Sequence, residues 1–370
     1  MSIKSEIKKE GIEIISALDS LTISSIASNI VEVLQNTFPE KNLNTHKIFS
    51  DIVKLNMYIA HLPAGCSAKY FYKNKSIYFS PNTSFKEMND LIVHECIHYL
   101  QELVNKKGKI VRLGFCDFTR SSLPGLGLNE AGVQLLASKC VNRKTETVSY
   151  FGLNFNTTSP DHYPLECALV NQLSFLIGNN VLFDSVLNSN DNFKNQFISY
   201  TSKETYETIQ KNIDLLIDMQ ENISLLSSYN ISHPKKVKQI QENNSKIEDF
   251  KLKIKKLFLD TQDLIFTSYF DSTINLLYTK ESIEKYRKKL YKFRKYVATS
   301  DGYTYFNRYY INKMSELENR VENSLSPITN NALIIYKESF LKIAIKRLKY
   351  LLKLTPKNAY NLYSERENYD

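Results

Sequence analysis

The stretch HECIHYLQE, residues 94–102, carries the pattern on which the interpretation of the chain depends. Two histidines, His94 and His98, stand four positions apart, and Glu95 follows the first of them. On a helix, residues four apart share one face, so both imidazoles can point at a single tetrahedral zinc ion. Glu95 is turned by roughly 100° from His94, which places its carboxylate beside such an ion rather than on it. The alternative is a core helix that contains two satisfied histidines.

Local signals favour a helix around this stretch. Ser84 and Glu87 have the spacing of a capping box at a helix start, and Gly108 is a typical helix stop. We therefore expect a helix over about residues 85–106, with the two histidines near its middle. Cys96 points away from the first histidine on this helix and is expected to pack in the core.

A catalytic zinc site usually has three protein ligands and one open position, so a third ligand must come from elsewhere. The best candidate is Glu130, at the start of a second expected helix, NEAGVQLLASKCV. Asn129 is the candidate N-cap of that helix. The alternative third ligand is Glu166, on a third expected helix that Pro164 opens and Gly178 ends.

His94-Glu95-x-x-His98, followed by Asn129-Glu130 at the start of a downstream helix, resembles the gluzincin group of zinc metallopeptidases, of which thermolysin is the familiar member. The resemblance implies a zincin-like α+β core over the matching part of the chain. It also implies that His94, His98 and Glu130 hold one catalytic Zn²⁺ and that Glu95 is the general base.

The chain departs from this group at one supporting position. Four residues after the ligand glutamate, the group favours an acidic residue that supports a zinc-bound histidine, and this chain has Gln134. A glutamine can accept the imidazole N–H through its amide oxygen, although without charge. We therefore expect Gln134, together with Asn129, to lie directly behind the metal ligands.

The resemblance also suggests residues that contact a substrate. A strand is expected at SIYFS, residues 76–80, and in the group the edge strand of a small sheet pairs with the substrate backbone. Ile77, Tyr78 and Phe79 would then line the cleft, and the alternative is a plain core strand.

A tyrosine or histidine stabilises the oxyanion in this group. His162 and Tyr163, in DHYPLE before the third helix, are the candidates, because imidazole and phenol are both capable donors. The alternative for this segment is an ordinary surface loop.

Composition restricts the class of protein. Of the 370 residues, 42% are hydrophobic and 24% charged, as in soluble globular proteins, and no stretch approaches the roughly 20 apolar residues of a membrane span. The N-terminus lacks the apolar segment of a signal peptide. The five cysteines form no CxxC, which favours free thiols and a cytoplasmic protein.

The pattern changes along the chain. Residues 1–185 combine expected helices with a hairpin in AKYFYKNKSIYFSP, which predicts a zincin-like catalytic domain. Residues 186–370 contain long helical patterns, including 206–226, 234–259, 281–297 and 332–354, and predict a helical domain. The net charge is +1 for residues 1–200 (19 basic, 18 acidic) and +8 for the remainder (29 basic, 21 acidic).

Two functions follow from these patterns. The first is a zinc-dependent peptidase that hydrolyses peptide bonds through a zinc-activated water, with Glu95 as general base and a peptide or protein as substrate. The second is a catalytically inactive, zincin-like binding module whose basic helical half docks a protein partner. Nucleic acid is a weaker expectation, because the basic residues suit solvated helix faces and match no recognised binding motif.

Overall fold

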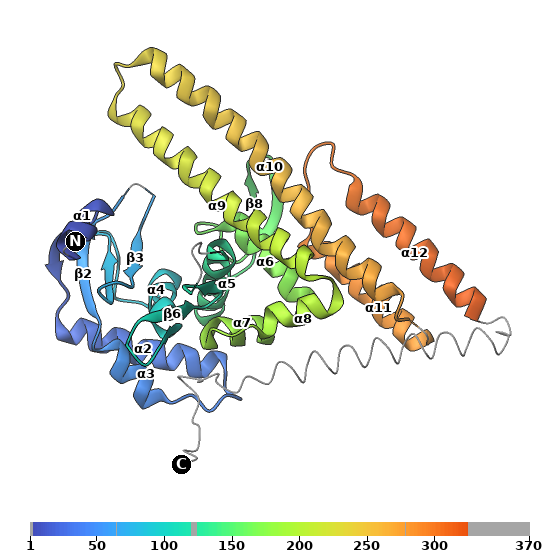
Figure 1. Cartoon of the computed structure of the whole chain (residues 1–370), viewed down its shortest axis with the longest axis horizontal. Coiled ribbons are helices and arrows are strands. Elements are labelled where there is room, and N and C mark those ends of the chain that lie inside the picture. Colours follow the sequence, from blue (N-terminus) through green and yellow to red (C-terminus); the bar gives the residue numbers. More distant parts are fainter. Residues whose placement is uncertain (1–2, 64, 120–123, 278, 325–370) are drawn as a thin grey trace.

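The computed structural model describes residues 3–63, 65–119, 124–277 and 279–324 (Figure 1). Within these residues the chain is a mixed α/β protein with small sheets and a helical C-terminal half, which confirms the expected combination of helices and strands at this coarse level. Two helices, α4 Asp90–Leu100 and α5 Leu126–Cys140, lie between the largest sheet and the helices of the second half.

The largest sheet has four strands in the order β1-β2-β4-β3. Its strands are β1 Glu13–Ala17, β2 Asn56–His61, β3 Ala68–Phe71 and β4 Ser76–Phe79. The expected hairpin is confirmed, because β3 and β4 pair antiparallel, while β2 and β4 pair parallel. Alternate residues of β4 face opposite sides: Ile77 and Phe79 enter the main core, and Tyr78 enters a small cluster with Ile7 of α1.

This strand order corrects one expectation. Residues 76–80 were expected to form the edge of the sheet, but β4 is paired on both sides and its side chains are buried. Ile77, Tyr78 and Phe79 therefore present neither free backbone groups nor accessible side chains to a ligand. The edge strand next to α4 is β3.

The helix with the two histidines is α4, Asp90–Leu100. It begins five residues later than expected, because Asn89 is the N-cap and its side chain accepts the N–H of Ile92. The capping box expected at Ser84 is therefore wrong. The helix ends before Gly108, since the chain continues as strand β5. Nearly all of α4 is buried, Cys96 included, as expected for that cysteine.

Helix α5, Leu126–Cys140, carries Glu130 and starts earlier than the sequence suggested. Gly125 precedes it at φ 95°, a conformation that glycine adopts without strain. Its first N–H groups are bound from a distant helix: Asp214 Oδ2 accepts from Gly125 N and Oδ1 from Gly127 N, both at 2.8 Å. The expectation that Asn129 caps this helix is wrong, because Asn129 lies one turn inside it.

The remaining elements of the first half surround this pair. Proline and glycine delimit α6 as expected, with Pro164 in its first turn and Gly178 at its end. The strands form a three-stranded sheet and a hairpin: β5 Glu102–Val104, β6 Ile110–Leu113 and β7 Cys116–Asp117, then β8 Glu146–Tyr150 and β9 Leu153–Thr157. The helices are α1 Ile3–Lys9, α2 Ser20–Thr37, α3 Thr45–Ile52, α6 Pro164–Ile177, α7 Asn179–Asn188 and α8 Asn192–Tyr200. Strand β1 lies between α1 and α2 in the chain.

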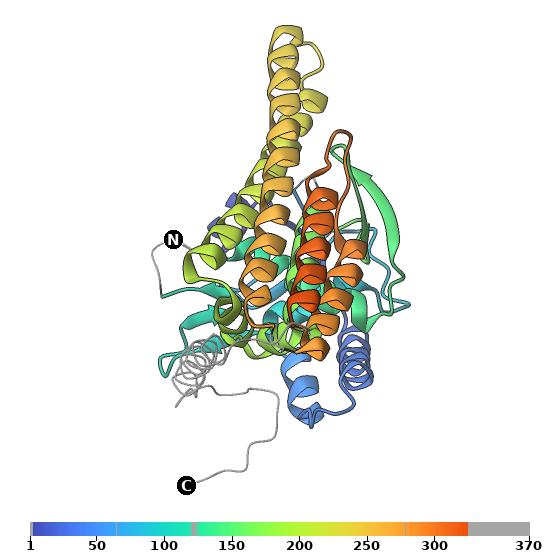
Figure 2. The ribbon, with the colours of Figure 1, turned by 90° about the vertical axis from the view of Figure 1, so that its right-hand side faces the viewer.

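The second half is helical, as expected. Its elements are α9 Lys203–Ser232, α10 Val237–Ile274, α11 Lys280–Phe293, a short 3₁₀ helix Arg294–Tyr296 and α12 Tyr305–Ser324. Helices α9 and α10 form a long hairpin whose tip projects beyond the body in both views (Figures 1 and 2). The helix expected at residues 332–354 lies outside the described residues.

The two halves share a hydrophobic core. One cluster of buried side chains extends from α2 to α12, and α5 and α6 pack against α9 and α10. At the crossing of α5 and α9, a Cβ on Gly127 would lie 2.8 Å from atoms of Ile213, so the contact between the helices requires a residue without a side chain. Among the described residues, every helix is too short or too polar to span a lipid bilayer.

The clamp from Asp214 onto α5 gives a testable stability effect. In Asp214→Asn, one of two acceptor oxygens becomes an amide donor that faces an N–H of α5. We expect the free energy of unfolding to fall by about 1–3 kcal/mol, measured by urea denaturation. The control is Asp218→Asn, an exposed position one turn further along α9. An equal effect of both substitutions would contradict the clamp.

Candidate metal centre

Three buried or nearly buried side chains converge between α4 and α5. The ligand atoms of His94, His98 and Glu130 all lie within 4.8 Å of one another. His94 Nε2 and His98 Nε2 are 2.9 Å apart, and Glu130 Oε2 lies 3.1 Å from the first and 3.2 Å from the second. Two imidazole nitrogens and one carboxylate oxygen are a donor set that catalytic zinc sites use, so this group could hold a metal ion.

A chain of hydrogen bonds fixes the orientation of His94. Gln134 Nε2 donates to Asp90 Oδ2 at 3.1 Å, and Gln134 Oε1 lies 2.9 Å from His94 Nδ1. Since Asp90 Oδ2 accepts from the amide nitrogen of Gln134, the amide turns its oxygen toward the histidine. His94 Nδ1 therefore carries the proton, and Nε2 presents its lone pair to the other two ligands.

Arg143 holds the far end of this chain. Its guanidinium donates to both carboxylate oxygens of Asp90 at 3.3 Å, which raises the pKa of Arg143. The expectation that Gln134 lies directly behind a ligand is thus matched by its position. The acidic residue absent from position 134 is present one step further out, as Asp90.

The three side chains change one another's protonation. Burial alone would lower the pKa of His98, but the charge of Glu130 and the hydrogen bond to it raise that pKa to about 9. Burial alone would raise the pKa of Glu130, but the neighbouring His98 and His94 hold it well below its usual value. Without a metal, the site therefore contains an ionised Glu130 beside a protonated His98.

Glu95 lies next to the triad and is also buried, at 6% exposure. Its Oε2 accepts the backbone N–H of Tyr70 at 2.5 Å. Tyr70 belongs to the edge strand β3, so the carboxylate is held between α4 and the sheet. This contact fixes one oxygen of Glu95.

The segment before α6 reaches the same place. The ring of Tyr163 stacks on that of His94, with centroids 6.0 Å apart and planes at 17°. The charge of Glu130, followed by burial, raises the pKa of Tyr163 well above its usual value, so the phenol keeps its proton. Tyr163 has φ 50° directly before a proline, a strained conformation for a bulky residue.

His162 lies near charged groups of the same site, including Asp90 and Glu95. Burial lowers the pKa of His162, with smaller opposing effects from Asp90 and Asp161. Its imidazole is therefore neutral near pH 7. The structure thus brings both expected oxyanion residues, His162 and Tyr163, to the neighbourhood of the triad.

Two other expected residues lie elsewhere. Glu166 is fully buried on α6, where Gln220 Nε2 donates to its Oε1 at 2.5 Å, and it takes no part in the triad. Burial raises its pKa to about 7. Asn129 was expected directly behind the ligands, but its side chain bonds elsewhere: its Oδ1 accepts from Phe115 N and from Gln101 Nε2.

Sequence reasoning missed Asp90, Tyr70 and Cys66. Asp90 could have been found, since it stands four residues before His94 on the same helix face. Tyr70 contacts Glu95 through its backbone N–H. Its residue type therefore gives no sign of this contact in the sequence. Cys66 precedes β3. Burial, together with the charge of Glu95, raises the pKa of its thiol to about 11, so the thiol keeps its proton near pH 7.

The raised pKa of His98 predicts how the metal-free site titrates. In the metal-free protein, His98 should titrate near pH 9 in NMR spectra of the imidazole nitrogens. Because the folded-state pKa lies above the ordinary 6.5, this pairing stabilises the fold fully below about pH 6.5. The contribution is lost as the pH rises through about 9.

The variant Glu130→Gln removes the charge responsible, so the midpoint of His98 should move toward the ordinary value. Glu146→Gln, an exposed position on β8, is the control. A midpoint for His98 that is unchanged by Glu130→Gln would contradict the assignment.

Comparison with known proteins gives no match for this chain. No family model matches the chain, and no curated protein or solved structure is significantly similar to it.

Proposed function

We propose that the protein is a zinc-dependent peptidase. The observation that carries this proposal is the convergence of His94, His98 and Glu130, with Glu95 directly after the first histidine. Two histidines, one carboxylate and an adjacent second carboxylate are the groups that zinc-assisted hydrolysis of an amide requires.

The three convergent residues would hold the ion. His94 offers Nε2 in the tautomer set by Gln134, and Glu130 offers an ionised carboxylate. His98 must lose its proton before its Nε2 can act as a ligand. When bound, zinc lowers the pKa of a water molecule in the site and polarises the substrate carbonyl.

Glu95 moves the proton in this reaction. One of its oxygens accepts the N–H of Tyr70, which leaves the other oriented to take a proton from the attacking water. The same oxygen then gives that proton to the nitrogen of the leaving amine as the peptide bond breaks. Burial of Glu95 excludes bulk water, which would otherwise compete for the proton.

Tyr163 and His162 would stabilise the oxyanion. Both keep a proton to donate near pH 7, because the pKa of Tyr163 is raised and that of His162 is lowered so that its imidazole is neutral. The strained backbone of Tyr163 supports such a role, since strain persists where the surrounding structure holds a side chain in place.

The substrate backbone would lie along β3. This is the edge strand next to α4. Its Tyr70 N–H is bound to Glu95, so a substrate would pair with other backbone groups of the strand. An extended peptide can add to such an edge by backbone hydrogen bonds, which makes a peptide or an unfolded protein segment the expected substrate.

The first test separates metal binding from catalysis. The purified protein should contain one zinc per chain by mass spectrometry, and Glu130→Ala should lose it. Glu95→Gln should keep the zinc but lose cleavage in a peptide-library digest by about 10²–10⁴-fold. Glu166→Gln, which changes the alternative third carboxylate, should keep both. Retention of zinc in Glu130→Ala or of activity in Glu95→Gln would refute the proposal.

The second test addresses the support behind His94. In Asp90→Asn, nothing forces the amide oxygen of Gln134 toward the histidine, so zinc affinity should fall by about 10–100-fold. Gln134→Glu alone would bury two carboxylates side by side and should also weaken the site. The double variant Asp90→Asn/Gln134→Glu restores one acid and one amide and should bind zinc better than either single variant. Additive losses in the double variant would contradict the proposed chain of hydrogen bonds.

A second candidate, a protein-binding module, is supported by the α9–α10 hairpin. Its outer part exposes large apolar side chains, Leu225, Ile231 and Val237, next to Lys235 and Lys236. Such a projecting surface suits a partner protein. The same digest distinguishes the two candidates, because a protein that holds zinc but cleaves no peptide would favour the protein-binding module.

A further inference from the structure

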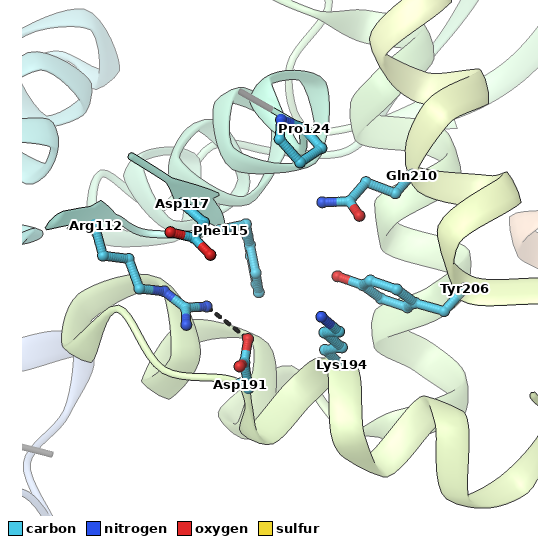
Figure 3. A pocket seen from close by; sticks show the side chains of 8 residues that line it. All are labelled: Arg112, Phe115, Asp117, Pro124, Asp191, Lys194, Tyr206 and Gln210. Carbon is cyan, nitrogen blue, oxygen red and sulfur yellow. Dashed lines mark hydrogen bonds and ion pairs between the residues drawn. The ribbon is translucent and has the colours of Figure 1, made fainter. Parts of the chain in front are cut away.

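A second polar pocket lies away from the triad, where the first half meets α8 and α9 (Figure 3). It encloses about 50 Å³, room for roughly four water molecules and hence for a small polyatomic ion. The residues that line it are Arg112, Phe115, Asp117, Pro124, Asp191, Lys194, Tyr206 and Gln210.

The hydroxyl of Tyr206 points into this pocket. Tyr206 is 1% exposed, and among the described residues no atom forms a hydrogen bond with its Oη. Figure 3 shows this hydroxyl directed toward the centre of the pocket. Burial raises the pKa of Tyr206, so the group remains a donor. A buried donor without an acceptor is costly, which points to a ligand that accepts from it.

Two further donors reach the same space. Lys194 is the basic residue in the lining that forms no ion pair with any described residue, and its Nζ lies 5.7 Å from the ring centroid of Tyr206. The Gln210 amide nitrogen packs against Gly125: a Cβ on Gly125 would lie only 2.3 Å from this nitrogen. Figure 3 shows the polar ends of all three side chains turned inward.

The acidic groups of the lining have partners within the fold. Asp191 pairs with Arg112 at 2.8 Å, and Arg112 also donates to the carbonyl of Gly114. Asp117 accepts from the backbone N–H and the hydroxyl of Thr119. Tyr206 Oη and Lys194 Nζ therefore remain available to a ligand, and Lys194 is a cation.

We propose that this pocket binds a small oxyanion, a carboxylate or a phosphate, through Tyr206, Lys194 and Gln210. A charged acceptor would satisfy the buried hydroxyl and neutralise the ammonium group together. The bound ion would join α8, which carries Lys194, to α9, which carries Tyr206 and Gln210. This inference does not rest on the zinc proposal, because none of the three donors belongs to the triad.

The test measures anion binding directly. The protein, dialysed into a buffer without oxyanions, is titrated with inorganic phosphate and separately with acetate, by calorimetry and by thermal unfolding. Sodium chloride at the same ionic strength is the reference. At least one of the two oxyanions should bind with saturation and raise the unfolding temperature above this reference. Phosphate alone or acetate alone identifies which source of oxyanion the pocket accepts.

Variants tie the binding to the pocket. Tyr206→Phe and Lys194→Met should each weaken binding by about tenfold or more, since each removes a hydrogen bond to a charged acceptor. Tyr291→Phe and Lys203→Met, both exposed and outside the pocket, should bind as the unaltered protein does. Without the anion, Tyr206→Phe should unfold at the same or a higher temperature, because it removes an unsatisfied hydroxyl.

Three results would overturn the proposal. The first is that neither oxyanion binds beyond the chloride reference. The second is that Tyr206→Phe and Lys194→Met bind as tightly as the unaltered protein. The third is a lower unfolding temperature for anion-free Tyr206→Phe, which would mean that the hydroxyl already has a partner within the fold.

Discussion

Two imidazole nitrogens and a carboxylate oxygen are packed together between α4 and α5, and this concentration of electron pairs constrains everything around it. Lone pairs that face each other at 2.9–3.2 Å repel unless a positive charge lies among them. In the metal-free protein that charge is a proton on His98, which explains why its pKa is raised. A divalent cation supplies the charge more effectively, and a site built this way is suited to one.

The helical half of the chain contributes to the geometry of this site. The Glu130 helix lacks a capping side chain of its own, and the two oxygens of Asp214 on α9 bind its first N–H groups instead. The close approach at Gly127 fixes the same helix against α9. The position of one ligand therefore depends on a residue 84 positions further along the chain than Glu130. The second half is therefore part of the scaffold of the site.

Local sequence patterns predicted the elements better than they predicted how the elements are joined. The spacing of His94 and His98 and the helical context of Glu130 predicted the cluster, because periodicity in a helix fixes which residues share a face. The pattern around Pro164 and Gly178 also predicted α6 within a residue or two. These features depend on neighbours in the sequence, which is where such patterns are informative.

The misjudged features depend on contacts between distant residues. Asn129 has the residue type of an N-cap, but the cap of α5 comes from α9. SIYFS has the composition of a strand, but its place inside the sheet follows from its parallel pairing with β2. The polar chain from Gln134 to Asp90 was visible only in part, since it needs the register between α4 and α5. No pattern in the sequence marks the pocket at Tyr206, whose lining comes from four separate segments.

X-ray absorption at the zinc edge of the zinc-loaded protein identifies the atoms that bind the ion. If His94, His98 and Glu130 hold it, the neighbours should be nitrogen and oxygen alone, with the imidazole nitrogens of two histidines at about 2.0–2.1 Å. A sulfur neighbour at about 2.3 Å, as from a cysteine thiolate, or a spectrum with fewer than two imidazoles would contradict this set of ligands.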